Sequence, residues 1–301
     1  MRRFTLFPLL LAAAGARPLA AGCASSAPSG IASLAANERR VPTPAGELVV
    51  RETGRGRTAL VLWHALYADP SMFESMIEQL APDYRLLVVA APGHGPSELP
   101  SGPLTSAASG AAVLAILDAH GIDRAGVVGC SWGGIAGIQA AAQAPERIAA
   151  VAAFNTPFGP GADDIGTRAI LWMTGWIGHT EFFGRRVAAG FFSPQTHKDK
   201  PPLVDKFVAV FPTRDQNKLQ AAARAVLIER ESLLPLLHKV RAPVLVVAGA
   251  DDRRYPAAEA EAAATQMPSA KFVRVESSAH LTPLEHPEVS ARLIRDLMPP
   301  R

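Results

Sequence analysis

VVGCSWGG, residues 127–134, is the most informative stretch of this chain. Two valines open it, and one glycine stands two residues before Ser131 while another stands two residues after it. This spacing is typical of a strand that turns sharply into a helix, because a Cβ at either glycine would crowd the turn. The stretch therefore predicts that Ser131 stands at a tight strand-to-helix turn.

On both sides of this turn, short apolar runs alternate with amphipathic segments. The runs that we expect to be strands are 47–52, 58–63, 85–91, 125–129, 148–154, 243–248 and 271–275. Segments with helical spacing are 71–80, 104–120 and 132–143. The apolar runs are continuous rather than alternating, as in strands with both faces covered by helices. The pattern predicts an α/β fold with a doubly wound, mostly parallel sheet.

One long segment, residues 155–239, interrupts this rhythm with no convincing strand. It is rich in large apolar side chains, among them Trp172, Met173, Trp176, Phe182 and Phe183. We interpret it as a helical lid inserted into a sheet domain formed by residues 45–154 and 240–301. Most of its aromatic residues are expected to pack the lid onto that domain.

Composition narrows the functional classes. The 301 residues are 49% hydrophobic and 19% charged, enough apolar material for one large core. The net charge is only +3 and the basic residues are scattered, so no nucleic-acid partner is predicted. The sequence has no His/Cys/Asp cluster at metal-ligand spacing, and GRGR at 54–57 lacks the lysine and helix of a phosphate-binding loop. No cofactor is therefore predicted.

The N-terminus has the pattern of an export signal over residues 1–22. Arg2 and Arg3 precede the apolar stretch 4–16, which is too short to span a bilayer. Small residues then precede Cys23, and residues 23–44 follow as a tether. The pattern resembles the lipobox of bacterial lipoproteins, although Leu19 lies one place too far from the cysteine.

This resemblance implies a lipidated Cys23, export to the cell envelope and membrane attachment through the lipid. The alternative is an ordinary cleaved signal that yields a secreted or periplasmic protein. The two initial arginines also permit twin-arginine export, although the rest of that motif is poor. The only other cysteine is Cys130, so no disulfide is predicted in the mature chain.

A serine at such a turn becomes a nucleophile when a histidine takes its proton and an acid orients that histidine. With this motif, residues 45–298 resemble the α/β-hydrolase fold superfamily, whose triad follows the chain order Ser, Asp or Glu, His. The resemblance makes Ser131 the nucleophile. It places the acid after the strand that follows the lid, where GADDRRYP offers Asp251 and Asp252. Asp252 matches the family's G-x-x-D-x-x-x-P pattern and is preferred.

The base is expected after the last strand, where His280 stands in SSAHLTPLEHP. His286 is interpreted as a surface residue at the start of the final helix. The resemblance also implies two backbone N–H donors for an oxyanion, from Trp132 and from Leu66 in the loop WHAL. Ala65 in that loop replaces the family's usual glycine, which restricts the backbone.

These residues together predict a serine hydrolase acting on an ester, thioester or lactone bond. C–C bond hydrolases, perhydrolases and acyltransferases share the triad and remain alternatives, as does a membrane-tethered binding protein of this fold. The apolar lid predicts a small to medium, largely apolar substrate. Three lid arginines could reach the mouth of the pocket: Arg168, Arg185 and Arg186.

Overall fold

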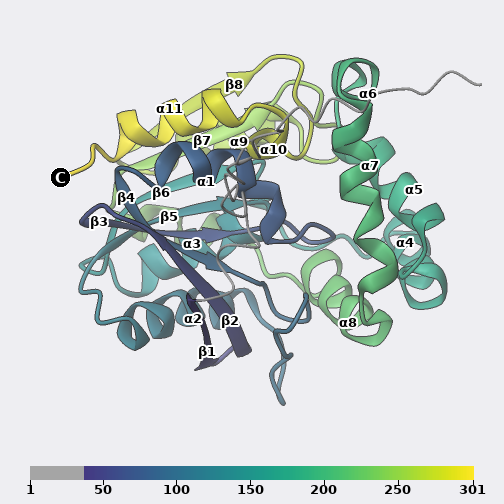
Figure 1. Ribbon diagram of the computed structural model, residues 1–301, viewed down its shortest axis with the longest axis horizontal. Coiled ribbons are helices and arrows are strands. Elements are labelled where there is room, and N and C mark those ends of the chain that lie inside the picture. Colours follow the sequence, from purple (N-terminus) through teal and green to yellow (C-terminus); the bar gives the residue numbers. More distant parts are fainter. Residues whose placement is uncertain (1–36) are drawn as a thin grey trace, which may run out of the picture.

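The computed structural model describes residues 37–301, which form one eight-stranded sheet covered by helices (Figure 1). The strands are β1 (Glu38–Thr43), β2 (Gly46–Gly54), β3 (Thr58–Trp63), β4 (Tyr84–Val89), β5 (Ala125–Cys130), β6 (Ile148–Phe154), β7 (Val244–Gly249) and β8 (Ala270–Val275). Seven of them match the expected apolar runs. The predicted α/β fold with a mostly parallel sheet is confirmed.

The order of the strands in the sheet is β1-β2-β4-β3-β5-β6-β7-β8. The pairs β1–β2 and β2–β4 are antiparallel, and every pairing from β4 to β8 is parallel. The chain passes from β3 outward to β4 and then returns to place β5 on the other side of β3. The loops after β3 and β5 therefore leave the sheet at its topological switch point, where α/β proteins bind ligands.

Helices cover both faces of the sheet. They are α1 (Glu74–Leu80), α2 (Ser106–Ala119), α3 (Trp132–Gln143), α9 (Ala257–Ala264), α10 (Thr282–Glu285) and α11 (Pro287–Leu297), with the 3-10 helices η2 (Pro70–Phe73) and η4 (Leu234–Lys239). Helix α1 packs against α11 on one face, and α2 packs against α3 on the other (Figure 1). Strands β5 and β7 are buried along their whole length, which explains their continuously apolar sequences.

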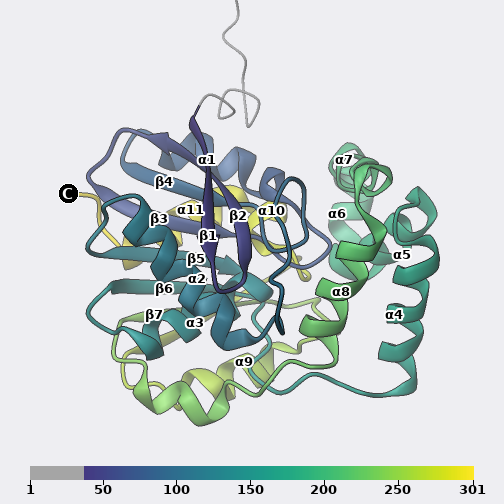
Figure 2. The ribbon, with the colours of Figure 1, turned by 90° about the horizontal axis from the view of Figure 1, so that it is seen from below.

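The predicted lid is an inserted helical region. It contains α4 (Ile165–Ile177), α5 (Glu181–Phe191), α6 (Pro194–Asp199), α7 (Pro201–Ala209), η3 (Phe211–Thr213) and α8 (Gln216–Leu227). These helices gather at the end of the sheet that lies away from the C-terminus (Figures 1 and 2). Side-chain oxygens of Asp164, Thr180 and Asp215 cap the first turns of α4, α5 and α8.

One expectation about these segments is corrected. The segment predicted as a tether, 23–44, contains the strand β1 in its last part, where it forms a hairpin with β2. Only Val41 of β1 is buried, so the sequence of this edge strand lacks a continuous apolar run. Most aromatic residues of the lid are packed, as expected, whereas three are exposed: Trp172, Trp176 and Phe182. The predicted signal peptide and Cys23 lie outside the described residues.

Candidate active site

Ser131 stands at the turn between β5 and α3. Its backbone has φ 53° and ψ −108°, a left-handed conformation that is strained for a residue with a side chain. A Cβ on Gly129 would overlap the backbone of Gly133, and a Cβ on Gly133 would overlap the carbonyl of Trp63. Both glycines are therefore required by close backbone approach, as the sequence indicated.

A hydrogen bond joins Asp252 and His280, the acid and the base of the expected triad. Asp252 follows β7 and His280 follows β8, and His280 Nδ1 donates to Asp252 Oδ2 over 2.7 Å. The other carboxylate oxygen, Oδ1, accepts the backbone N–H groups of Arg254 and Tyr255, each over 3.1 Å. Asp251, the alternative acid, is exposed and makes no side-chain hydrogen bond in the described chain.

The carboxylate form of Asp252 is stabilised although the residue is buried. Burial by itself would raise the pKa of Asp252. The charge of His280, its hydrogen bond and the two backbone N–H groups outweigh this effect, so the pKa of Asp252 lies below its ordinary value. An ionised Asp252 can hold His280 with its Nδ1 protonated, which leaves Nε2 as the proton acceptor.

Asn155 is a further partner of Asp252. It directly follows β6 with φ 47°, and its Nδ2 donates to Ala279 O over 2.8 Å and to Asp252 Oδ2 over 3.3 Å. The neutral amide of Asn155 therefore joins the acid to the residue before His280.

The two expected oxyanion donors, Leu66 and Trp132, stand shortly after β3 and β5 in the chain. Trp132 is the first residue of α3, so its backbone N–H has no acceptor within the helix. The Leu66 N–H makes no hydrogen bond with any group in the described part of the chain. Because Trp63 and Gly129 are register partners in β3 and β5, the two loops leave the sheet side by side.

The loop that carries Leu66 is held from the sheet side by His64. His64 Nδ1 donates to Ala65 O over 2.8 Å, and its Nε2 accepts from the Ala91 N–H over 2.9 Å. Burial is the main reason that the pKa of His64 falls to about 4, so the ring is neutral near pH 7. The left-handed residue of this loop is Tyr67 and not Ala65, so the alanine in place of glycine imposes no strain.

A half-buried lid residue, Arg214, also holds this loop. Its Nη2 donates to Tyr67 O over 2.8 Å and to Ala68 O over 3.3 Å. Burial lowers the pKa of Arg214 to about 10. The chain carries no motif at Arg214, and only the folded structure reveals its contact with this loop.

Glu285 is a second residue that the sequence did not single out. It is fully buried and accepts the backbone N–H of Ala279, next to His280, over 2.7 Å. It also accepts the Ser193 N–H and the Thr196 hydroxyl from the lid, each over 2.7 Å. The Phe191 carbonyl accepts the backbone N–H of His280 over 3.0 Å. The lid is thus hydrogen-bonded directly to the loop that carries His280.

Ser131 and His280 open into one cavity of about 400 Å³ between the sheet and the lid. Its walls are mainly apolar: Leu66, Tyr67, Ile170, Met173, Phe183, Val187, Phe191, Val226, Leu227 and Tyr255. In the described chain no hydrogen bond joins Ser131 Oγ to His280 Nε2, and such bonds are often long until a substrate is bound.

Three arginines also line this cavity: Arg186, Arg253 and Arg254. Of the three lid arginines expected at the mouth, only Arg186 is there. Arg168 and Arg185 are paired on the surface with Asp163 and Asp205, at 2.7 and 3.1 Å.

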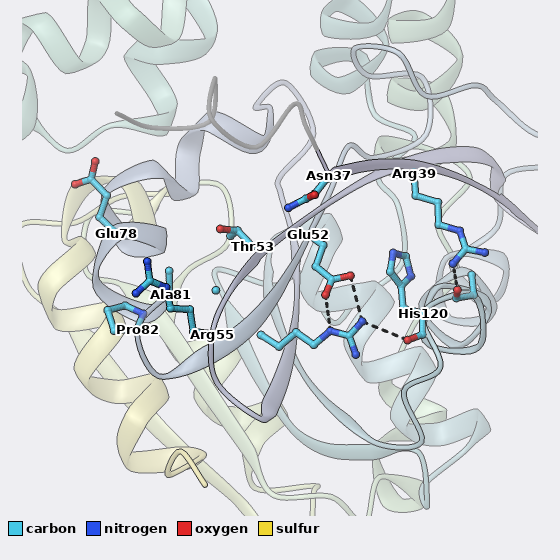
Figure 3. A pocket seen from close by; sticks show the side chains of 12 residues that line it. Asn37, Arg39, Glu52, Thr53, Arg55, Glu78, Ala81, Pro82 and His120 are labelled. Carbon is cyan, nitrogen blue, oxygen red and sulfur yellow. Dashed lines mark hydrogen bonds and ion pairs between the residues drawn. The ribbon is translucent and has the colours of Figure 1, made fainter. Parts of the chain in front are cut away.

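A larger hollow of about 970 Å³ lies elsewhere, between the β1–β2 hairpin, β4 and the end of α2 (Figure 3). Arg85, at the start of β4, is paired there with Glu52 at 2.6 Å and also donates to the His120 carbonyl. Ser131 follows the end of β5. Because β4 and β5 run in the same direction, this hollow at the start of β4 lies at the opposite end of the parallel strands from Ser131.

In residues 37–301, no group of three or more His, Cys, Asp or Glu side chains could hold a metal ion. None of the helices in that range is both long enough and apolar enough to cross a membrane.

The chain belongs to the alpha/beta hydrolase fold family, because the model of that family matches residues 58–287. The fold and the geometry of this site agree with that family. Among curated relatives, it is 27% identical over 247 residues to 3-oxoadipate enol-lactonase 2 of Acinetobacter baylyi, covering 80% of this chain and 89% of that protein. It is 30% identical over 258 residues to a pimeloyl-[acyl-carrier protein] methyl ester esterase of Xanthomonas campestris, covering 78% and 93%.

Among solved structures, a hydrolase from Pseudomonas aeruginosa superposes with a TM-score of 0.79 at 26% identity. The superposition covers 88% of this chain and 99% of that one. The resemblance that the sequence suggested is therefore confirmed at the level of the family.

Proposed function

We propose that this protein is a serine hydrolase that cleaves an ester, thioester or lactone bond. The observation that carries the proposal is the 2.7 Å hydrogen bond between His280 and Asp252, beside a serine held in a strained left-handed turn. Relatives named as an enol-lactonase and a methyl ester esterase support the same class of bond.

In the proposed reaction, Ser131 Oγ attacks the carbonyl carbon while His280 Nε2 takes the hydroxyl proton. The Leu66 and Trp132 N–H groups stabilise the oxyanion of the tetrahedral intermediate. His280 then gives its proton to the departing alcohol or thiol, which leaves an acyl group on Ser131. Water, deprotonated by the same nitrogen, releases the acid and restores the serine.

The cavity supports an acyl group of a few carbons with an apolar body. Its apolar walls surround the space next to Ser131, and each methylene buried there contributes about 0.8 kcal/mol to binding. We therefore propose a small to medium substrate whose chain lies against Ile170, Phe183 and Leu227.

A fluorophosphonate probe tests the proposal directly, because it reacts only with an activated serine. Peptide mapping should find the probe on Ser131, and Ser131→Ala should abolish labelling and the hydrolysis of p-nitrophenyl esters. A wild-type protein that neither reacts with the probe nor hydrolyses any such ester would favour a binding protein of this fold.

We also propose that the protein is exported and held at a membrane by lipid on Cys23. This proposal rests on the amino-acid pattern of residues 1–22 and 23–44 alone. One acyl chain anchors a protein only marginally, so stable attachment needs the several chains of a bacterial lipoprotein. Labelled palmitate should enter the wild type and not Cys23→Ser. A soluble mature protein that begins at another residue would indicate an ordinary secretory signal.

A further inference from the structure

The cavity that contains Ser131 is lined by three cationic side chains and by no anionic one. Arg186 comes from α5, whereas Arg253 and Arg254 directly follow Asp252. We propose that the substrate carries a carboxylate on its acyl part, and that these arginines bind it. This inference rests on the proposed hydrolase function and names the class of ester or lactone that the site prefers.

The three arginines lack the carboxylate partners that neighbouring arginines have. In residues 37–301, none of the three lies within 4.0 Å of a carboxylate oxygen, whereas Arg168 and Arg185 each form an ion pair. The first 36 residues contain no Asp or Glu, so they cannot supply the missing partner. Asp205 of α7 pairs with Arg185, whereas the next residue of α5, Arg186, lines the cavity.

The position of Arg254 is fixed relative to the reacting groups. The backbone N–H of Arg254 donates to Asp252 Oδ1, so the backbone of this arginine is fixed beside the acid that orients His280. Its guanidinium extends to the lid, where Nη2 donates to Thr167 Oγ1 over 3.3 Å. Asp164 is the nearest carboxylate along this path, one hydrogen bond beyond Thr167. In the described part of the chain, Arg186 and Arg253 have no such link.

Like charges around one cavity repel one another, and a bound anion relieves that repulsion. A cleft lined by charges of one sign attracts ligands of the opposite sign, and apolar walls of low dielectric constant strengthen that attraction. A guanidinium also presents paired N–H donors that match the two oxygens of a carboxylate. The chemistry therefore favours an acyl chain with an apolar body near Ser131 and an anionic end at the arginines. This departs from the expectation of a largely apolar substrate drawn from the lid sequence.

Two matched substrates test this inference: the mono-p-nitrophenyl esters of adipic acid and of adipamic acid. They have nearly the same size, but only the first carries a charge, and their chain is long enough to disfavour attack by the carboxylate on its own ester. For the wild type, we expect kcat/KM to be at least tenfold higher for the adipate ester, with the difference mainly in KM. Raising the salt concentration should reduce the preference, since exposed charges are screened.

Arg253→Gln and Arg186→Gln should each lower kcat/KM several-fold more for the adipate ester than for the adipamate ester. Arg185→Gln is the control, because it removes a neighbouring charge that is already paired outside the cavity. Equal kcat/KM for the two esters in the wild type would overturn the inference, as would variants that slow both esters equally.

A readout that does not depend on turnover separates this inference from the proposed function. Adipate should protect Ser131 from the fluorophosphonate probe at lower concentration than adipamide does. If Ser131 is labelled and adipate protects no better than adipamide, the carboxylate site is wrong and the hydrolase proposal stands. If Ser131 is not labelled and neither ester is hydrolysed, both proposals fail.

Discussion

The two walls of the cavity differ in how strongly the fold constrains them. On the sheet wall, Ser131, Asp252 and His280 are 4%, 4% and 2% exposed, and each follows the end of a strand. The lid wall is formed instead by side chains from three separate helices, α4, α5 and α8, among them Ile170 and Phe183. The chemistry thus depends on backbone geometry at the sheet edge, whereas the choice of substrate depends on side chains that could change without altering that geometry.

The largest effects are expected on the sheet wall. Ser131→Ala removes one oxygen and should lower kcat by at least about 10⁴-fold, because no other group can form the acyl-enzyme. His280→Ala should cost about as much, and the double variant no more than either, since triad members act as a unit. Steady-state kinetics with p-nitrophenyl butyrate, together with circular dichroism to show an intact fold, make this measurement. A double variant that loses activity additively would contradict a shared mechanism.

The next effect distinguishes two adjacent aspartates. Asp252→Asn should lower kcat by about 10²- to 10⁴-fold, because an amide cannot hold His280 in the tautomer that leaves Nε2 free to accept a proton. Asp251→Asn should change kcat by less than about twofold, because its exposed side chain has no partner. Comparable losses in the two variants, or the reverse order, would show that the acid is assigned wrongly.

His64 links the sheet wall to acid stability. Its pKa is lowered to about 4 in the folded protein, so between about pH 6.5 and 4 the unfolded chain binds a proton that the folded chain does not. The stabilisation is therefore complete above pH 6.5 and is lost as the pH falls, by roughly 3 kcal/mol from this residue. Urea unfolding at several pH values should show the loss.

His64→Gln is the matched variant for this prediction. It should be less stable than the wild type at pH 7, and its stability should change less between pH 7 and 4. His94 is also buried, with its pKa held below the ordinary value mainly by burial, so part of the pH dependence should remain. An unchanged slope in the variant would exclude His64 as a source of acid sensitivity.

A smaller effect is expected where the lid holds the sheet wall. Arg214→Met removes the hydrogen bonds to Tyr67 O and Ala68 O and should lower kcat by about tenfold, since the Leu66 N–H would lose its fixed position. KM should change less than kcat. Arg230→Met is the control, because Arg230 is also a buried lid-side guanidinium bonded to carbonyls, but to those of Gly159, Pro160 and Val226. A loss of stability without any change in kcat would leave Arg214 a purely structural role.

The residues of the sheet wall could be proposed from the sequence because their requirements are local. Glycines flank Ser131 since the backbone passes too close for a Cβ, and Asp252 stands in a turn of recognisable spacing. The partners of these residues are distant in the chain. Arg214 binds a carbonyl 147 positions away, and no pattern around Arg214 or Glu285 signals such a contact. The strand β1 was missed because almost all of its residues are exposed.

The smallest effect concerns the length of the acyl chain and tests how the lid wall fills the cavity. Each methylene buried against the apolar lining is worth about 0.8 kcal/mol, which is about a fourfold rise in kcat/KM per carbon. Specificity constants should therefore climb from acetyl to butyryl or hexanoyl esters and fall once the space of about 400 Å³ is full. Phe183→Ala should move the optimum to a longer chain, because this buried lid ring lines the cavity. Trp176→Ala, which removes an exposed ring on the outer surface of the same lid, should leave the optimum unchanged. A flat series in the wild type, or a shift caused by Trp176→Ala and not by Phe183→Ala, would mean that the acyl chain does not lie in this cavity.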